Sequence, residues 1–452
     1  MTATVNPMRP PAGAPRPYQF PDFERHRLSN GLTVWLVPLR GRELVSVHLL
    51  FDAGAAAEDE IHGGIAALTA RLLVTGTRRL DAAAFAEATE RLGLELSSES
   101  SWDSARAAFS ALGTQLDPGL ELLCEMVREP RLDEGEFERL KAERLADILQ
   151  SRADPGRLAD EMFLRSTYAE ETPYRRPAAG APETVEELTV DDARAHHAAH
   201  FAPSSAHLII AGGFDPSAAR LAAERQLGEW TGDARGHRRF DSAARDGRRV
   251  VLVDRPGAVQ SELRVGHVGI DRHDPRYFHA TVMAGLLGGT FGSRLNLRLR
   301  EELGYTYGAR AGFDPRRAAG PFTATAAVQT EVTVPAIGEL LGQLDRMRET
   351  TPGDDELSDV KDFLIGVFPL RFETTGGVAG AIEPLAVYGL PDDYWQTYRQ
   401  RIEEVSPADA HRAAEELIRP DELVILLTGD AARVRDDLTA AGYGPLEELA
   451  AT

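Results

Sequence analysis

Histidines at metal-binding spacing lie in one segment of this 452-residue chain. His196 and His200 are one helical turn apart, with His197 between them, so on a helix the two imidazoles share a face. Imidazoles so spaced can bind zinc when a further ligand is close by. No recognised motif supplies that ligand, and the internal repeat described below has Ala413 and Leu417 at the positions of His196 and His200. We therefore expect no metal role for these histidines.

A second segment, GIAALTARLLVTGT at residues 64–77, has the frame of a zinc-binding helix without its ligands. It resembles the opening helix of the insulinase/pitrilysin (inverzincin) metallopeptidases, in which H-x-x-E-H lies between a glycine with small apolar residues and an apolar triplet with Gly-Thr. Ala67 and Arg71 stand at the two histidine positions, and Ala70 at that of the catalytic glutamate. Zinc needs imidazole, thiolate or carboxylate donors, and a guanidinium has no lone pair to give. The resemblance therefore implies a non-zinc member of the family, with no metal or cofactor in this chain.

Two further residues near these positions have side chains that could bind zinc. Glu143, within KAERLADI at residues 141–148, matches the family's third zinc ligand, a glutamate on a later helix. One carboxylate does not hold zinc, so we expect Glu143 to be a solvated helix residue that pairs with its neighbours. His62 precedes Gly63 and Gly64, and we expect it in a loop rather than in place of a lost ligand.

The resemblance continues in the second half of the chain, where Arg298 and Tyr305 match the pair that completes the family's active site. In the family this pair holds the substrate carbonyl and stabilises the oxyanion, through donors whose hydrogen bonds strengthen as charge develops. Seven residues make two helical turns, so both side chains can share one face if the helix extends that far and ends at Gly304. Spacing alone also allows a surface ion pair at Arg298 and a half-buried Tyr305; the family frame favours the functional role.

Two more segments have a family counterpart or a possible ligand. In the family, an extended peptide adds to the edge of a sheet. The matching strand here is Leu94–Ser100, which makes Leu96, Ser97 and Ser98 candidate substrate-binding residues, with a solvated edge strand as the alternative. Gly288–Leu295 lacks the lysine of a phosphate-binding loop, so we expect a tight turn into a helix there.

Composition restricts the class of protein. A net charge of −21 disfavours nucleic acid and anionic membranes as partners, since both require a basic face. The single cysteine, Cys124, lies in an apolar run and is expected to be a buried thiol. We find no apolar segment of signal-peptide or membrane-span length and expect a cytoplasmic protein.

The chain is one unit written twice, because residues 189–213 align without gaps to residues 406–430 at a constant offset of 217. Each copy begins with a pair of alternating strands, at 32–37 with 45–51 and at 250–253 with 261–267, which suggests hairpin-like antiparallel pairs. We expect an α+β fold of two homologous domains, each a mostly antiparallel sheet layered with helices, that form half of or a whole clamshell. The expected division is a disordered tail over 1–20, domains over 21–230 and 250–452, and a linker over 231–249.

An intact Arg298 and Tyr305 beside an emptied zinc helix lead to one functional hypothesis. The chain resembles the bacterial two-subunit branch of the family, similar to mitochondrial processing peptidase. It would pair with a homologous subunit that brings H-x-x-E-H, zinc and the general base, and the complex would cleave peptides. The alternatives are a non-enzymatic peptide-binding or assembly protein and, with no site to support it, a self-sufficient peptidase.

Overall fold

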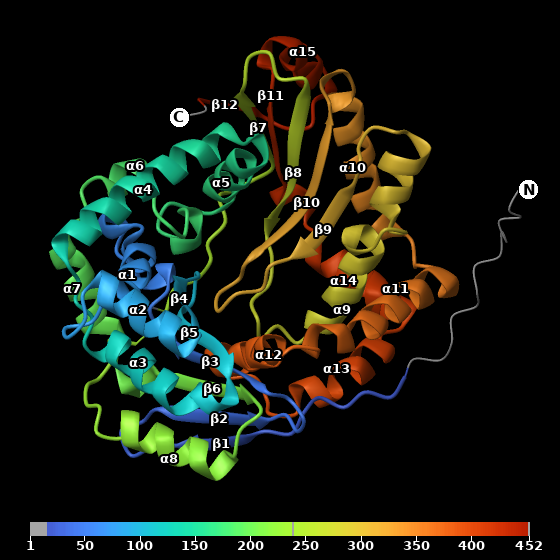
Figure 1. Ribbon diagram of the computed structural model, residues 1–452. Helices are drawn as coiled ribbons and strands as arrows, with labels where there is room; N and C mark the ends of the chain where they lie inside the picture. The colour runs from blue at the N-terminus through green and yellow to red at the C-terminus, as the bar shows by residue number, and fades with distance from the viewer. Residues whose placement is uncertain (1–15, 237–238, 451–452) are drawn as a thin grey trace, which may run out of the picture.

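The computed structural model describes residues 16–236 and 239–450, which form two six-stranded sheets covered by helices (Figure 1). The first half contains the strands β1 (Glu24–Arg27), β2 (Thr33–Pro38), β3 (Leu44–Phe51), β4 (Glu95–Ser100), β5 (Ala105–Leu112) and β6 (His207–Gly212). Its helices are α1 (Ile65–Leu73), α2 (Ala82–Leu92), α3 (Leu116–Arg128), α4 (Glu134–Ala153), α5 (Pro155–Thr167), α6 (Pro182–Val185), α7 (Val190–His200) and α8 (Pro216–Leu227).

The second half repeats this order. Its strands are β7 (Arg249–Asp254), β8 (Gln260–Val268), β9 (Ala309–Phe313), β10 (Pro321–Gln329), β11 (Val424–Gly429) and β12 (Leu446–Leu449). Its helices are α9 (Tyr277–Ala284), the π-helical turns η6 (Gly285–Gly289) and η7 (Asn296–Glu302), α10 (Thr333–Glu349), α11 (Asp354–Val367), α12 (Thr375–Tyr388), α13 (Tyr394–Glu403), α14 (Pro407–Leu417) and α15 (Ala431–Ala441). The expected α+β class and the two layered, mostly antiparallel sheets are confirmed.

The offset of 217 residues reappears as equivalent helices and strands. It relates the starts of α7 and α14, of β6 and β11, and of α3 and α10. Thr189 and Ser406 cap α7 and α14 in the same way. The side chain of each accepts a hydrogen bond from the backbone N–H of an aspartate three residues later, and the carboxylate of that aspartate accepts one from the backbone N–H of the capping residue. The duplication seen in the sequence is therefore a duplication of packed structure.

The prediction that the two strands at the start of each copy pair with each other as hairpins is wrong. The first sheet has the order β1-β2-β6-β3-β5-β4, and the second has the order β12-β7-β11-β8-β10-β9. The buried strand β6 lies between β2 and β3, parallel to the first and antiparallel to the second, and β11 does the same between β7 and β8. A strand buried on both faces gains most from a central position, so the last apolar strand of each copy separates the first two.

One helix of each half packs against the sheet of the other half. Helix α5 of the first half packs on β8 and β11, and α12 of the second half packs on β3 and β6. At the second contact the Glu383 carboxylate lies 2.6 Å from His48 Nδ1 and 2.9 Å from Arg106 Nη1. The two sheets are therefore joined by helices that both halves need to bury their apolar surfaces.

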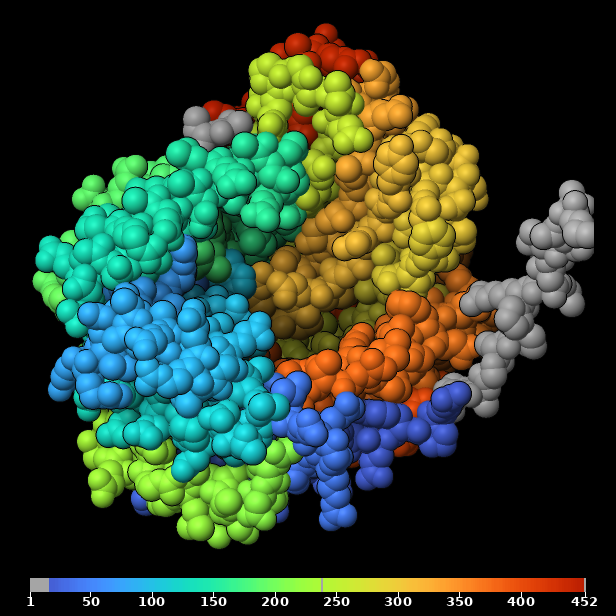
Figure 2. Space-filling view, viewed as in Figure 1, coloured from blue at the N-terminus to red at the C-terminus, as the bar shows by residue number. Residues whose placement is uncertain are grey.

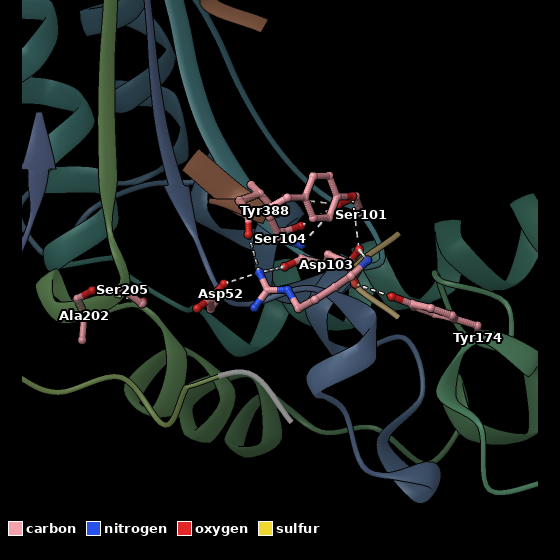
Figure 3. A network of polar contacts seen from close by, with 10 residues as sticks. Asp52, Ser101, Asp103, Ser104, Tyr174, Ala202, Ser205 and Tyr388 are labelled. Atoms are coloured by element: carbon pink, nitrogen blue, oxygen red, sulfur yellow. Dashed lines mark hydrogen bonds and ion pairs between the residues drawn. The ribbon is translucent and has the colours of Figure 1, made fainter. Parts of the chain in front are cut away.

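A buried carboxylate joins the two halves a second time. Asp103, in the turn between β4 and β5, accepts hydrogen bonds from the Tyr174 hydroxyl at 2.7 Å, the Tyr388 hydroxyl at 3.2 Å and the Arg317 backbone N–H at 3.0 Å. Figure 3 shows Tyr174 and Tyr388 around Asp103. Arg317 belongs to the loop between β9 and β10 and also donates to Asp52 at 2.7 Å. These contacts fix the second sheet's hairpin against the first half.

Two residues near the ends of the predicted domains belong to the packed structure, and the domain division itself stays a prediction. Residues 1–15 of the expected tail lie outside the described part of the chain, but Phe20 is buried against the second half, where its ring meets Phe372 and Trp395. The packed chain therefore begins before residue 21. Arg249, expected in the linker, is the first residue of β7; the other boundaries stay predictions. No helix in residues 16–236 or 239–450 is long and apolar enough to cross a membrane.

Candidate functional site

Helix α1 begins where the resemblance places the zinc helix. Gly64 adopts a left-handed conformation (φ 99°) at its start, in close contact with Gly180. The buried Glu58 carboxyl group accepts the backbone N–H of Gly64 at 3.1 Å and that of Ala66 at 2.7 Å, which satisfies two donors at the helix start. Burial raises the pKa of Glu58 to about 8 against the opposing effect of these bonds. The frame of the zinc helix is thus fully formed.

An ion pair lies at the positions of the lost ligands. Arg71 Nη2 is 2.9 Å from Glu143 Oε2 on α4, and Arg71 Nη1 is 3.6 Å from Asp147 Oδ2. Arg139 also binds Glu143, as expected for a solvated helix residue paired with its neighbours. With methyl groups at Ala67 and Ala70 and a cation at Arg71, these residues do not fit zinc. Over the described residues, no group of three or more histidine, cysteine, aspartate or glutamate side chains could hold a metal ion.

The candidate substrate strand borders the same place. β4 is an edge strand of the first sheet, and its residues Leu96, Ser97 and Ser98 line an open groove of about 600 Å³ together with Arg71 and Glu143. In Figure 2 the surface is hollowed between the blue and teal elements of the first half and the gold and orange elements of the second. The hydroxyls of Ser98 and Ser100 are buried and have no hydrogen-bond partner among the described residues. A peptide role for Leu96, Ser97 and Ser98 stays a prediction.

Arg298 and Tyr305 lie on neighbouring stretches of the second half and not on one continuous helix. Arg298 belongs to η7, which ends at Glu302, and Gly304 turns the chain with a φ of 65°. The chain then folds back, so that the Tyr305 N–H donates to the Leu299 carbonyl at 2.8 Å. Gly304 therefore ends the helix as expected, but the helix does not reach Tyr305, so the two side chains do not share one helical face. Tyr305 is half-buried against the core of the second half.

Two carboxylates hold the Arg298 guanidinium. Its Nε and Nη2 donate to both oxygens of Glu339 on α10, each at 2.8 Å, and its Nη1 donates to Glu302 at 2.7 Å. The hydrogen bonds that Arg298 donates to Glu339 and then to Glu302 raise the pKa of Arg298, and the bond between Arg298 and Glu339 lowers the pKa of Glu339. A guanidinium has five N–H donors, so two remain for another acceptor. Sequence reasoning missed Glu339, since a residue so distant in the chain carries no spacing signal.

The remaining candidate residues have the following surroundings. His196 and His200 are buried with ring centroids 4.7 Å apart, and burial lowers the pKa of His196 to about 3. His197 Nε2 lies 2.7 Å from the Val127 carbonyl, and His62 is 3.5 Å from Asp192. Cys124 is buried, and burial raises its pKa to about 12. Gly288–Leu295 spans the end of η6, where a Cβ on Gly288 would lie 2.3 Å from the Ala311 nitrogen.

Comparison with known proteins agrees with this geometry. Residues 36–181 match the model of insulinase (peptidase family M16), and residues 187–364 match that of the peptidase M16 inactive domain. The chain is 26% identical over 370 residues to the non-peptidase homolog YmxG of Helicobacter pylori, covering 80% of this chain and 83% of that protein. It is 24% identical over 424 residues to an uncharacterized zinc protease of Streptomyces coelicolor, covering 91% and 92%.

A solved structure has the same fold. The peptidase M16 inactive domain from Pseudomonas fluorescens superimposes with a TM-score of 0.84 at 25% identity, covering 90% of this chain and 98% of that one. The two family models together span most of the chain, and the ligand positions of α1 contain no zinc donor. The chain therefore belongs to the insulinase (M16) peptidase family, as a member whose own catalytic site is incomplete.

Proposed function

We propose that this chain is the non-zinc subunit of a heterodimeric zinc peptidase. It supplies Arg298, Tyr305 and part of the wall of the chamber that the two subunits would enclose. A homologous partner supplies H-x-x-E-H, the zinc ion and the general base. The single observation that carries the proposal is the state of the Arg298 guanidinium: Glu339 fixes its plane, two of its N–H groups make no hydrogen bond to a described residue, and its side chain is 32% exposed.

The role of this chain in the reaction follows from those donors. The guanidinium of Arg298 and the hydroxyl of Tyr305 donate hydrogen bonds to the carbonyl oxygen of the scissile peptide bond as negative charge develops there. Bonds to a developing oxyanion are stronger than bonds to the ground-state carbonyl, so they lower the barrier. Glu339 acts as a positioning residue, because a bidentate pair holds the guanidinium in one plane before substrate arrives. Zinc bound in the partner would supply the activated water.

A non-enzymatic peptide-binding or assembly role is the alternative, and one observation favours it. Arg298 is already paired with Glu339 and Glu302, an arrangement that would equally serve as a structural ion pair. The two functions differ in what happens when Arg298 is removed. An assembly protein keeps its complex and never had hydrolysis to lose, whereas a catalytic subunit keeps its complex and loses hydrolysis.

The test is reconstitution with the product of the adjacent gene, followed by metal analysis of each chain and of the complex. We expect the two chains to co-purify, zinc to follow the partner, and peptide cleavage to require both. Arg298→Ala and Tyr305→Phe should each reduce cleavage by about 10²-fold or more, as for the loss of an oxyanion donor. Arg300→Ala is the matched control, because Arg300 lies on the same helical turn but pairs with Glu301 and stacks on Phe291.

Cleavage unchanged in Arg298→Ala and Tyr305→Phe, with the complex intact, would reject the catalytic role. Zinc and proteolysis in this chain purified alone would reject the division of labour altogether.

A further inference from the structure

The duplication gives the groove of the first half a counterpart in the second. The first groove lies where α1, β4 and α4 meet. By element order their equivalents are α9, β9 and α11, and α9 contacts both of the others (Figure 1). A pocket of about 230 Å³ lies there, which we call the α9-β9-α11 pocket. Its lining includes Tyr277, Thr281, Phe313, Leu364, Arg371 and Tyr398.

The two sites differ in charge. In the first groove, Glu143 and Glu136 pair with Arg71 and Arg139. In the α9-β9-α11 pocket no carboxylate is among the lining residues, and Arg371 is the one charged side chain there. Within the described ranges, the exposed residue Arg371 makes no ion pair with any carboxylate, and its side chain is hydrogen-bonded to the Tyr398 hydroxyl at the pocket. The pocket therefore offers a single cation at the side of an apolar space.

The size and lining of the pocket limit what can fill it. The aromatic rings of Tyr277, Phe313 and Tyr398 line the pocket. Gly285, Gly289 and Gly312 also line it, and because glycine has no side chain they leave its space open. An apolar cavity of about 150 Å³ is enough to hold benzene in a protein core. A pocket of about 230 Å³ thus accepts one phenyl or branched aliphatic group with a small polar head, but not two residues of a peptide.

We propose that the α9-β9-α11 pocket binds the carboxyl-terminal residue of a peptide, with its apolar side chain among the three rings and its terminal carboxylate on Arg371. Guanidinium and carboxylate form charge-assisted hydrogen bonds, and a terminal residue is the one place in a peptide where a carboxylate and a single apolar side chain come together. The choice of a peptide rests on the proposed function, because hydrolysis creates such a terminus. The pocket itself needs neither the partner nor zinc.

Calorimetric binding to this chain alone tests the inference. The probe is N-acetyl-Ala-Ala-Phe with a free carboxyl terminus, and the same peptide with an amidated terminus removes only the negative charge. We expect the free acid to bind at least tenfold more tightly than the amide, and Arg371→Gln to abolish that difference. Equal binding of acid and amide by the unchanged chain would overturn the proposal.

A variant that fills the pocket provides an independent readout. A Cβ at Gly312 would meet nothing within 4 Å and the backbone φ there is not positive, so Gly312→Leu should fold and occupy the space. It should weaken binding of the acid at least tenfold. Gly366→Leu is the control, because a Cβ at Gly366 also meets nothing within 4 Å but that residue does not line the pocket. Circular dichroism checks that both variants fold, and undiminished binding by folded Gly312→Leu would overturn the site.

Free N-acetylphenylalanine separates the two sources of the same chemistry. The peptide should bind at least as tightly as this small carboxylate; tighter binding of the small carboxylate would overturn the assignment to a peptide terminus. Binding by this chain together with failed hydrolysis in the reconstituted mixture would reject the proposed function and keep the pocket. Hydrolysis without selective acid binding would do the reverse.

Discussion

Arg71 Nη2 lies 2.9 Å from Glu143 Oε2, so a permanent cation pairs with the carboxylate that matches the third zinc ligand of the insulinase family. The guanidinium supplies positive charge next to the leftover carboxylate, as the metal would, but it cannot acidify water. Both side chains are more than a third exposed, at 37% and 45%, so the pair is a surface ion pair with a small effect on stability. Its significance lies in position, because it shows that α1 and α4 bring position 71 within hydrogen-bond distance of Glu143.

We predict that this placement can be used to restore zinc binding. In the combined variant Ala67→His, Ala70→Glu, Arg71→His, the two imidazoles would lie one helical turn apart and face the Glu143 carboxylate, which gives three ligands. Metal analysis after dialysis should find one zinc ion per chain. Adding Glu143→Ala should weaken the affinity by more than about tenfold. A folded combined variant without zinc would show that α1 and α4 are not arranged as a zinc site.

We predict that Arg298→Lys impairs the reconstituted peptidase almost as much as Arg298→Ala does. Lysine keeps the charge but cannot form the bidentate bond with both oxygens of Glu339, so the donors are no longer fixed in one plane. The fall should be about 10²-fold and mainly in kcat, since the donors act on the transition state. Steady-state kinetics measure it, with Arg300→Lys as the control. A wild-type kcat in Arg298→Lys would mean that charge alone matters.

We predict that Asp103→Asn destabilises the junction between the two halves. The amide NH₂ group cannot accept a hydrogen bond, so one of the donors from Tyr174, Tyr388 and the Arg317 backbone loses its acceptor in a buried place. An unsatisfied buried donor costs about 1–3 kcal/mol, which urea unfolding should show as a lower midpoint. Asp233→Asn, in the segment between the halves and exposed, is a control that should leave the midpoint unchanged. A midpoint equally unchanged in Asp103→Asn would remove Asp103 from the junction's energetics.

We predict a pH dependence that originates at Glu58. Burial raises the pKa of Glu58 to about 8 in the folded chain, whereas in the unfolded chain the group ionises near its ordinary pKa of 4.5. Between these values the folded chain keeps a proton that the unfolded chain releases, so this group's contribution to stability is full below pH 4.5 and falls as the pH rises to 8. The slope is roughly 1.4 kcal/mol per pH unit.

Urea unfolding of wild type and Glu58→Gln at pH values of about 5, 6.5 and 8 measures this effect, because these pH values cover most of the range between the unfolded and folded pKa values of Glu58. The wild type should lose more stability than Glu58→Gln as the pH rises, because glutamine has no proton to release. Equal losses in the two proteins would mean that Glu58 ionises in the folded chain as it does in the unfolded chain.

Local patterns predicted the parts of the fold that depend on neighbouring residues. The frame around Ala67, Ala70 and Arg71 predicted α1, the alternating residues 94–100 predicted the edge strand β4, and the repeat predicted that α7 and α14 are equivalent. The strand pairing was wrong, because strand segments read in chain order do not reveal that β6 and β11 insert between their predecessors. Gly304 ends the helix that contains Arg298 as expected, but spacing alone did not reveal that Tyr305 lies beyond that helix.

By itself, the sequence determined that this chain lacks zinc ligands and keeps Arg298 and Tyr305, because a side chain's donor chemistry is a property of the residue and needs no neighbours. Only the tertiary structure decided what those residues contact. Arg71 is paired across helices with Glu143, and Arg298 is held by Glu339 from a distant helix. The α9-β9-α11 pocket, with Arg371 in its lining, is formed by residues that only the folded chain brings together. Such contacts join residues far apart in the chain, so packing sets them and spacing along the sequence does not.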